Sequence, residues 1–322
     1  MELLIGGSPC THWSIAQTKN RETTAEGIGW ELFLNYRIAR DKYQPDYFLY
    51  ENNKSMSSAI RTQITAELGV EPVLINSALV SAQNRQRLYW AGTRNPDGTY
   101  SKVPVELPED RGILLRDILE TGVARGEPIN ITPDGKAQTL KAQYAKNSIA
   151  NFCGYTSTYG ATGVAEPVAI KPLTGKEMAY MVRDGRIAIK GKEYPIKLRD
   201  GCYIIRKLTV RECMRLQTVP EEYVFPVSDS QAYKMLGNGW TVDVIAHIMS
   251  HFEGLTAEPV EVLSMYDGMG CGRIALNKLG ANVTAYYATE IDKYAIQATQ
   301  HNFPDTVQLG DAFQVREEGW TV

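Results

Sequence analysis

The chain has 322 residues, of which 43% are hydrophobic and 22% charged, the composition of a globular protein that can bury one large core and a smaller one. No apolar run reaches the length of a membrane span, and the N-terminal residues lack the basic flank of a signal peptide, so membrane and secreted proteins are disfavoured. The five cysteines are an odd number without a CxxC pair, which predicts free thiols in a reducing, cytoplasmic compartment.

The net charge of −3 does not by itself suggest a nucleic-acid-binding protein, but the charge is unevenly distributed. Residues 111–207 hold 16 basic and 9 acidic side chains, whereas the rest of the chain is acidic. The basic segment is either a polyanion-binding face or a solvated surface that is basic by chance, and charge alone does not decide. His247 and His251 lack the acid expected beside a zinc pair, so no metal site is expected.

Short apolar runs alternate with helical patterns over residues 1–104, which predicts an α/β segment. The predicted strands cover residues 3–5, 47–50, 72–78 and 87–91, and the predicted helices cover residues 30–39 and 57–68. Helical periodicity fades over residues 105–205, where Gly, Thr and Tyr become frequent. This segment is therefore expected to form a separate, β-rich small domain, with strands over residues 186–190 and 203–205.

The remaining third of the chain returns to alternating helices and strands. A capping box from Thr209 to Glu212 predicts a helix that runs to Gln217. A polar stretch over residues 253–261 is typical of a linker. The other predicted helices begin at residue 232 (interrupted at 237–239), 241, 273 and 292, and the predicted strands cover residues 260–266, 283–289 and 306–309.

A glycine-rich turn follows the strand predicted over residues 260–266. Gly268, Gly270 and Gly272 let the backbone turn tightly and approach a ligand, and the helix start beyond them offers free N–H groups. Glu290 ends the next predicted strand, where an acid can accept from both ribose hydroxyls. Asp311 ends the third, where it can accept from an adenine amine. This succession fits an adenosyl-type nucleoside better than a generic turn with two solvated acids.

The spacing of these glycines bears on the nature of the cofactor. Loops that bind NAD normally keep the spacing G-x-G-x-x-G, whereas the glycines here follow G-x-G-x-G. The residues therefore favour S-adenosylmethionine over NAD, and a dehydrogenase stays open as a rival enzyme.

Reactive side chains follow the predicted strands of the N-terminal half. Cys10 comes just after the first buried strand, and Pro9 stiffens the turn that presents its thiol. Glu51 closes the next strand, and Arg85 and Arg87 precede another. Each could be a structural cysteine or a solvated charge. Together they place a thiol, an acid and two basic groups at neighbouring strand ends, where reactive groups of open α/β sheets gather.

At these residues the sequence resembles the DNA (cytosine-5) methyltransferase family. The residues within its motifs are most similar to the branch that includes the eukaryotic de novo DNA methyltransferases. Two positions depart from the family pattern, Asn53 in place of Val and Cys271 in place of a frequent Gly, and neither is the reacting group. The matching motifs, which span nearly all of the chain except residues 105–205, are Gly7-Ser-Pro-Cys10, Glu51-Asn52, Gln83-x-Arg85-x-Arg87, Arg206-x-Leu-Thr-x-x-Glu212-x-x-Arg-Leu-Gln217, Gly237-Asn238, Gly-x-x-Trp240, Tyr266-x-Gly-x-Gly270, Glu290 and Gly310-Asp311.

The order of the motifs also departs from the family. Its members run from the glycine loop through the acids to Pro-Cys, whereas here Pro9-Cys10 comes first and the glycine loop follows residue 260. The resemblance implies an α/β, Rossmann-like S-adenosylmethionine-dependent methyltransferase sheet that is circularly permuted, with a smaller β-rich target-recognition domain. The expected parts are a catalytic half (1–104), the target-recognition domain (105–205), a return to the methyltransferase domain (206–252), a linker (253–261) and the cofactor-binding half (262–322).

The resemblance also implies residue roles. Cys10 would add to C6 of cytosine, Glu51 would hold N3 and the exocyclic amine, and Arg87, with Arg85 nearby, would grip the O2 edge. The cytosine would leave the duplex stack, and residues 11–29 would close over it. The residues implied for S-adenosylmethionine are Tyr266, Asp267, Gly268, Gly270, Gly272, Glu290, Ile291 and Asp311, with Asn238, Gly239 and Trp240 against its methionine end.

The partner that the resemblance implies is double-stranded DNA, read by the basic segment along the major groove. Arg183, Arg186, Lys190 and Lys192 are candidate contacts. A cognate restriction enzyme, a monomeric or weakly dimeric state and a bacterial or phage origin are further expectations. A tRNA cytosine-5 methyltransferase of the same fold and a non-catalytic DNA-binding relative remain as alternatives. The large basic domain favours DNA, and the intact Cys10 and Glu51 favour an enzyme.

Overall fold

A computed structural model describes all residues except 16–20, 121–125, 154–159, 169–177 and 318–322. The chain divides into two compact units, one made of Met1–Asn76, Gln86–Pro108 and Val242–Val322, the other of Ser77–Arg85 and Glu109–Thr241. Residues 206–241 group with the second unit, so the chain rejoins the first unit at Val242. The functional division expected from the sequence stays a prediction.

The first unit is built on an eight-stranded sheet. Its strands, in spatial order, are β14 (Val307–Gly310), β13 (Asn282–Thr289), β12 (Pro259–Met265), β1 (Glu2–Gly6), β2 (Tyr47–Asn53), β4 (Gln86–Arg94) and β3 (Val73–Asn76), and β5 (Tyr100–Lys102) pairs with β4. The strands from β14 to β2 are parallel, whereas β4 runs antiparallel to both of its neighbours. Although β1 comes first in the chain, it lies between β12 and β2, with Leu4 opposite both Leu263 and Phe48.

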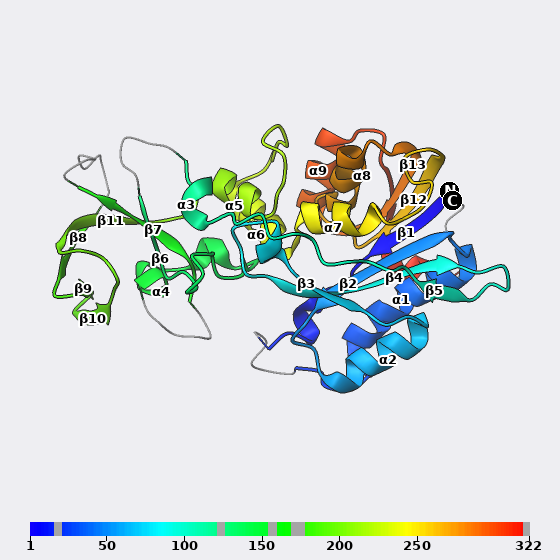
Figure 1. Cartoon of the computed structure of the whole chain (residues 1–322), viewed down its shortest axis with the longest axis horizontal. Coiled ribbons are helices and arrows are strands. Elements are labelled where there is room, and N and C mark those ends of the chain that lie inside the picture. Colours follow the sequence, from blue (N-terminus) through cyan, green and yellow to red (C-terminus); the bar gives the residue numbers. More distant parts are fainter. Residues whose placement is uncertain (16–20, 121–125, 154–159, 169–177, 318–322) are drawn as a thin grey trace. The chain divides into compact units, whose positions relative to one another are not determined.

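Helices cover both faces of this sheet (Figure 1). On one face lie α1 (Gly27–Tyr43) and α2 (Ser58–Leu68), and on the other lie α7 (Val242–Met249), α8 (Cys271–Leu279) and α9 (Lys293–Asn302). The ends of α2 show why the chain is helical there: the Ser57 side chain accepts a hydrogen bond from the amide of Ile60, and Gly69 ends the helix at a φ of 74°. The 3-10 helix η4 (Ala312–Arg316) packs on α1.

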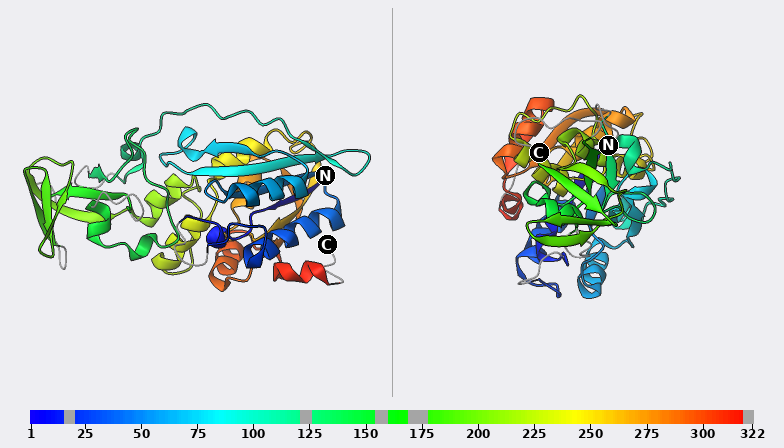
Figure 2. Two further views of the ribbon diagram at one scale, coloured as in Figure 1. Left: turned by 90° about the horizontal axis from the view of Figure 1, so that it is seen from below. Right: turned by 90° about the vertical axis from the view of Figure 1, so that its left-hand side faces the viewer.

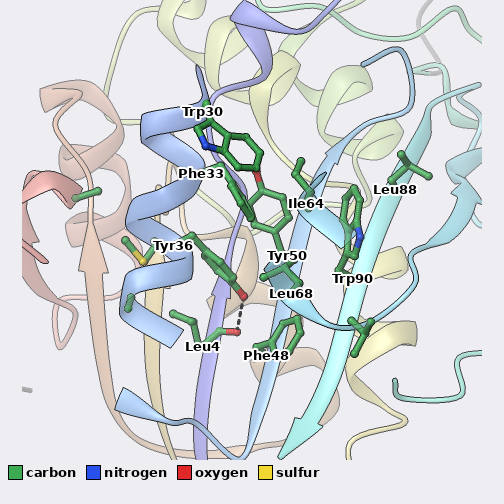
Figure 3. Packing of buried hydrophobic residues seen from close by; sticks show 14 of the residues in the cluster. Leu4, Trp30, Phe33, Tyr36, Phe48, Tyr50, Ile64, Leu68, Leu88 and Trp90 are labelled. Atoms are coloured by element: carbon green, nitrogen blue, oxygen red, sulfur yellow. Dashed lines mark hydrogen bonds between the residues drawn. The ribbon is translucent and has the colours of Figure 1, made fainter. Parts of the chain in front are cut away.

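The core between α1, α2 and the sheet is rich in aromatic side chains (Figure 3). Phe33 and Tyr36 of α1 are fully buried and pack on Tyr50 of β2, with ring centroids 5.3 and 4.9 Å apart. The Tyr36 hydroxyl donates to the Leu4 carbonyl, 3.3 Å away in β1. This packing fixes β1 and β2, the two strands that lead into the reactive residues.

The second unit contains an antiparallel sheet built from residues 127–207 (green in Figure 2). In spatial order its strands are β10 (Lys192–Pro195), β9 (Arg186–Ile189), β8 (Ala179–Arg183), β11 (Gly201–Lys207), β7 (Gly163–Pro167) and β6 (Glu127–Ile129). Its α-helices are α3 (Leu115–Ile118), α4 (Ile149–Cys153), α5 (Val210–Leu216) and α6 (Asp229–Asn238).

The sequence predicted the elements of the first unit better than those of the second. All strands and helices predicted for residues 1–104 and 260–310 are present. One further strand, β5, was not predicted. In the second unit the capping box of α5 is confirmed, with Thr209 and Glu212 each accepting from the other's backbone amide, whereas β6, β7, β8 and β10 were missed. All five cysteines are free, as predicted. Within the described ranges, no helix is both long and apolar enough to cross a membrane.

Candidate active site

Buried polar side chains hold the loop that carries Cys10. The Asn52 side-chain amide donates to the Ser8 carbonyl and to the Tyr50 hydroxyl, each 3.1 Å away, and the Ser8 and Tyr50 hydroxyls are 2.7 Å apart. These side chains are buried, so the loop after β1 is tied to the end of β2 by hydrogen bonds protected from water. Cys10 then begins the 3-10 helix η1 (Cys10–His12), where it is partly exposed.

Glu51 and Arg87 form an ion pair on neighbouring strands. In the β2–β4 register, Asn53 lies opposite Arg87 and Glu51 lies opposite Tyr89, so Glu51 and Arg87 share a face of the sheet. Arg87 Nε lies 3.0 Å from Glu51 Oε1, and the two side chains are only 15% and 13% exposed. Because the pair is largely desolvated, its charges interact more strongly than in water. The arrangement holds a carboxylate in a fixed position near the carboxyl end of β2.

The glycine loop between β12 and α8 has the geometry of a nucleoside-binding turn. Three alternate positions have positive φ angles, 60° at Tyr266, 62° at Gly268 and 77° at Gly270. The backbone of Tyr266 tolerates this conformation because its amide donates to Thr289 and its hydroxyl donates to the Leu32 carbonyl, 2.7 Å away. A Cβ added at Gly268 would meet nothing within 4 Å, so the backbone there is open to a ligand.

Glu290, at the end of β13, is tied to the glycine loop. Its Oε2 accepts from the Gly268 amide at 2.9 Å, and its Oε1 accepts from the amides of Ile291 and Asp292, both at 2.8 Å. Ile291, next along the chain, is 75% exposed, an unusual environment for an isoleucine. Asp311, after β14, is exposed and accepts from the Phe313 amide at 3.0 Å.

Asp267 is a buried carboxyl group inside the loop. Its Oδ1 accepts from the hydroxyls of Ser264 and Tyr286, each 2.7 Å away, while its buried Oδ2 has no hydrogen-bond partner among the described residues. Burial raises the pKa of Asp267 to about 6, against which the two hydroxyl donors act. An unpaired carboxyl oxygen, free space beside Gly268 and the acid at Glu290 together fit a cationic, ribose-containing cofactor such as S-adenosylmethionine.

The parallel pairing brings most of the predicted site residues to one edge of the first unit's sheet. The carboxyl ends of β14, β13, β12, β1 and β2 lie side by side at this edge. The first four strands lead into Asp311, Glu290, the glycine loop and Cys10 respectively, and Glu51 lies within β2, two residues before its end. Their individual roles stay predictions.

Arg85 differs from the sequence-based expectation. It was expected beside Arg87 at the target base, but it belongs to the second unit and is only 3% exposed. Its guanidinium donates to the carbonyls of Leu140, Gly237 and Gly239 at 2.9, 3.2 and 2.8 Å. Arg85 and Arg87 are only two positions apart in the sequence, yet Arg85 binds backbone carbonyls whereas Arg87 pairs with Glu51. Asn238, Gly239 and Trp240 also lie in the second unit, at the end of α6.

The four candidate DNA contacts lie on the β8–β10 strands and turns. Arg183, Arg186, Lys190 and Lys192 are all exposed, and Arg186 pairs with Glu193, whose carboxylate is 2.9 Å away. Their exposure leaves them available to phosphates, because a solvent-exposed ion pair is weak.

Glu22 is a contact that the sequence did not reveal. Its carboxylate accepts from the Gly29 amide at the start of α1 and from the Trp13 indole, at 3.2 and 3.1 Å. Trp13 is fully buried, so both arms of the loop predicted over residues 11–29 are anchored at their bases. Residues 16–20 of that loop lie outside the described residues. No local pattern would have paired Glu22 with Trp13.

The part of the chain that the structure describes contains no cluster of three or more His, Cys, Asp or Glu side chains that could hold a metal ion. His247 and His251 instead interact with backbone carbonyls, His247 with Glu106 and His251 with His247.

Comparison with known proteins places the chain in a family. The model of the C-5 cytosine-specific DNA methylase family matches residues 1–253. The chain belongs to this family. It is accordingly a DNA cytosine-5 methyltransferase, and the resemblance seen in its motifs is confirmed. The family match ends before β12, so the glycine loop falls outside it.

Individual relatives agree with the family match. The chain is 29% identical over 257 residues to the Type II methyltransferase M.HpaII of Haemophilus parainfluenzae, covering 76% of this chain and 69% of that protein. It is 30% identical to the Type II methyltransferase M1.ScrFI of Lactococcus lactis subsp. cremoris over 76% of this chain and 60% of the relative. The methyltransferase EhMeth of Entamoeba histolytica shares the fold, with a TM-score of 0.50 and 15% identity over 77% of this chain and 76% of that one. A methyltransferase fold of the predicted α/β class is thus confirmed.

Proposed function

We propose that this C-5 methylase transfers the methyl group of S-adenosylmethionine to cytosine C5 within a specific sequence of duplex DNA, through a covalent bond between Cys10 and C6. One observation carries the proposal: the Cys10 loop and the Glu51–Arg87 pair stand at adjacent strand ends, next to the glycine loop. This places a thiol nucleophile, a fixed carboxylate and a nucleoside-binding turn at one sheet edge.

Cys10 begins the reaction by adding its thiolate to C6 of cytosine, which converts C5 into an enamine-like nucleophile. Glu51 holds N3 and the exocyclic amine of the base and stabilises the charge that develops during addition. Arg87 keeps Glu51 in place through their ion pair and faces the O2 edge. Bound S-adenosylmethionine supplies an electrophilic methyl group to C5. A base then removes the C5 proton, and the electrons of that C–H bond expel Cys10.

A cytosine in a duplex cannot reach Cys10 while it is stacked, so the target base leaves the helix, at a cost of about a few kcal/mol. The segment from Thr11 to Gly29 follows Cys10 directly. Glu22 ties its two described parts together, because its carboxylate accepts hydrogen bonds from Trp13 and from the Gly29 amide. We expect that segment to cover the flipped base and exclude water.

The cofactor residues have distinct parts in this proposal. Glu290 accepts from the ribose hydroxyls, Ile291 covers a face of the adenine, and Asp311 accepts from the adenine amine. The exposure of Ile291 supports its part, because a bound adenine would bury it. Tyr266, Asp267, Gly268, Gly270 and Gly272 form the turn around the methionine part, and Asn238, Gly239 and Trp240 complete that side.

The basic segment of the second unit is the target-recognition domain in this proposal. Its exposed cations, Arg183, Arg186, Lys190 and Lys192, would contact phosphates or base edges of the major groove.

The chain order is proposed to be a circular permutation of the order usual in the family. Two observations support it: the family match ends at residue 253, and the glycine-loop strand β12 nevertheless lies directly beside β1. The sheet then keeps the same spatial neighbours while the chain enters it at a different strand. Residues 253–261 are the proposed linker across the former ends, and β12 already begins within them, at Pro259.

The relatives are named Type II methyltransferases, which supports the proposal that this chain acts together with a cognate restriction enzyme in a bacterial cytoplasm. A monomeric or weakly dimeric state is the corresponding expectation.

Bisulfite sequencing tests the activity and reads the site together. DNA from cells that express this chain, in a host without cytosine methylation, should carry 5-methylcytosine at one sequence context. The same host expressing Cys10→Ala should carry none. Labelled-methyl transfer in a mixture of duplex DNA and tRNA should label the DNA, and label confined to tRNA would overturn the proposal in favour of the tRNA alternative.

A further inference from the structure

Two buried side chains from distant segments close the carboxyl end of α6. Arg85 donates to the Gly237 and Gly239 carbonyls, at 3.2 and 2.8 Å, and Gln217 Nε2 donates to the carbonyls of Leu236 and Gly239, at 2.5 and 3.2 Å. The last carbonyls of a helix have no partners within the helix and carry partial negative charge. A buried guanidinium and a buried amide are therefore suited to hold them.

Arg85 also joins α6 to a second backbone segment. A Cβ on Gly237 would lie 2.3 Å from the backbone nitrogen of Ala142 and the carbonyl carbon of Lys141, so only glycine permits this approach. Beside that contact, the second donor nitrogen of Arg85 reaches the Leu140 carbonyl at 2.9 Å. Arg85 thus fastens the two segments together where their backbones touch.

The chain beyond the turn is held by the same polar network. Thr241 Oγ1 donates to Gln217 Oε1 at 2.9 Å and accepts from the Ser77 hydroxyl at 2.8 Å. Gln83 donates to the same Gln217 oxygen at 3.2 Å. All of these side chains are essentially buried. The segment from Asn238 to Trp240 is therefore held at Gly237 and Gly239 and again at Thr241.

We infer that Arg85 is a positioning residue, which fixes the Asn238–Trp240 turn for the cofactor and does not contact the target base. The inference rests on the proposed function, in which that turn meets the methionine end of S-adenosylmethionine. Its support is the geometry of Arg85, whose two terminal nitrogens already donate to three carbonyls in a side chain that is only 3% exposed. Arg87, by contrast, faces Glu51.

Arg85→Lys is the direct test, because lysine keeps the charge but cannot span three carbonyls with a planar fork. We expect its KM and Kd for S-adenosylmethionine to rise about tenfold, with kcat at saturating cofactor within about threefold of wild type and KM for duplex DNA unchanged. A kcat about a hundredfold lower at saturating cofactor, with an unchanged cofactor Kd, would overturn the inference and leave the proposed function intact. A wild-type chain that methylates no DNA would instead overturn the proposed function.

Lys136→Met is a matched control, since Lys136 is also a buried cation that donates to backbone carbonyls, those of Ala78 and Ser81, at 2.7 and 3.2 Å. It should lower the melting temperature without changing the cofactor Kd. If it raises that Kd as much as Arg85→Lys does, general loosening explains both and the inference fails. Should Arg85→Lys not fold, Thr241→Val decides: a cofactor Kd raised about threefold at an unchanged DNA KM supports the inference, and an unchanged cofactor Kd contradicts it.

Discussion

Arg87 Nε lies 3.0 Å from Glu51 Oε1, and this pair is far more buried than the ion pair between Arg94, at the end of β4, and Asp46, just before β2. Glu51→Gln keeps the shape of the side chain but removes the charge proposed to stabilise the base during addition. We expect kcat/KM for methyl transfer to fall by about a hundredfold to a thousandfold.

The other pair is the control for this prediction. Arg94 and Asp46 are 2.9 Å apart but 38% and 42% exposed. Asp46→Asn should leave kcat/KM within about twofold of wild type, because exposed ion pairs contribute little. Equal losses in the two variants would contradict the role proposed for Glu51.

Cys10→Ala should reduce methyl transfer to below about a thousandth of wild type, because it removes the proposed thiolate nucleophile. Duplex DNA with 5-fluorocytosine at the target should trap the wild-type chain covalently and leave the variant free on a denaturing gel. Cys202→Ala removes the other partly exposed cysteine, and its adduct should form normally. A Cys10→Ala protein that still forms the adduct would remove Cys10 from the mechanism.

Glu290→Ala should weaken the binding of S-adenosylmethionine more than the binding of DNA. Without the Glu290 carboxylate, the ribose hydroxyls would lose their proposed acceptor, and the Gly268 amide would lose an acceptor at 2.9 Å. The cofactor Kd should therefore rise about tenfold or more. Calorimetric titration with cofactor measures this. Glu261→Ala, an exposed acid on β12, is the control and should bind as wild type does. Equal Kd values for wild type and Glu290→Ala would exclude the ribose contact.

The buried Asp267 makes the stability of the fold depend on pH. Its pKa rises from 3.8 to about 6 on burial, so the folded state binds a proton more tightly than the unfolded state does. Its contribution to stability is therefore fully present below about pH 4 and is lost as the pH rises through about 6. Asp267→Asn cannot ionise, so its stability relative to wild type should increase by about 2–3 kcal/mol between pH 4 and pH 7. Urea denaturation at several pH values measures this, and a constant difference would contradict it.

Gly272 allows α8 to pack against β1. A Cβ at Gly272 would lie 2.2 Å from Ile5 Cδ1, so Gly272→Ala should lower the free energy of unfolding by about 1–3 kcal/mol. Ile5→Val removes that methyl group. The double variant should therefore recover part of the loss, and strictly additive effects in denaturation experiments would show that this contact is not the cause.

Local chemistry made much of the site predictable. The strand before Cys10, the acid after Tyr50 and the glycine turn from Gly268 are short-range patterns, and each pattern carries its own physical reason. The elements of the first unit were predictable for the same reason, since buried parallel strands are near-continuous apolar runs. The strands of the second unit are shorter and more polar, so β6, β7, β8 and β10 left too weak a signal.

The contacts of Arg85 and Arg87 separate what each level of structure determined. The sequence by itself determined that two arginines alternate beside a strand, that a thiol follows Pro9, and that a glycine turn follows a buried strand. Only the tertiary structure decided that Arg87 faces Glu51 while Arg85 closes the end of α6, and that β1 lies beside β12. The physical reason is that side-chain partners and strand neighbours come from residues tens to hundreds of positions apart, and no local pattern encodes which of them will meet.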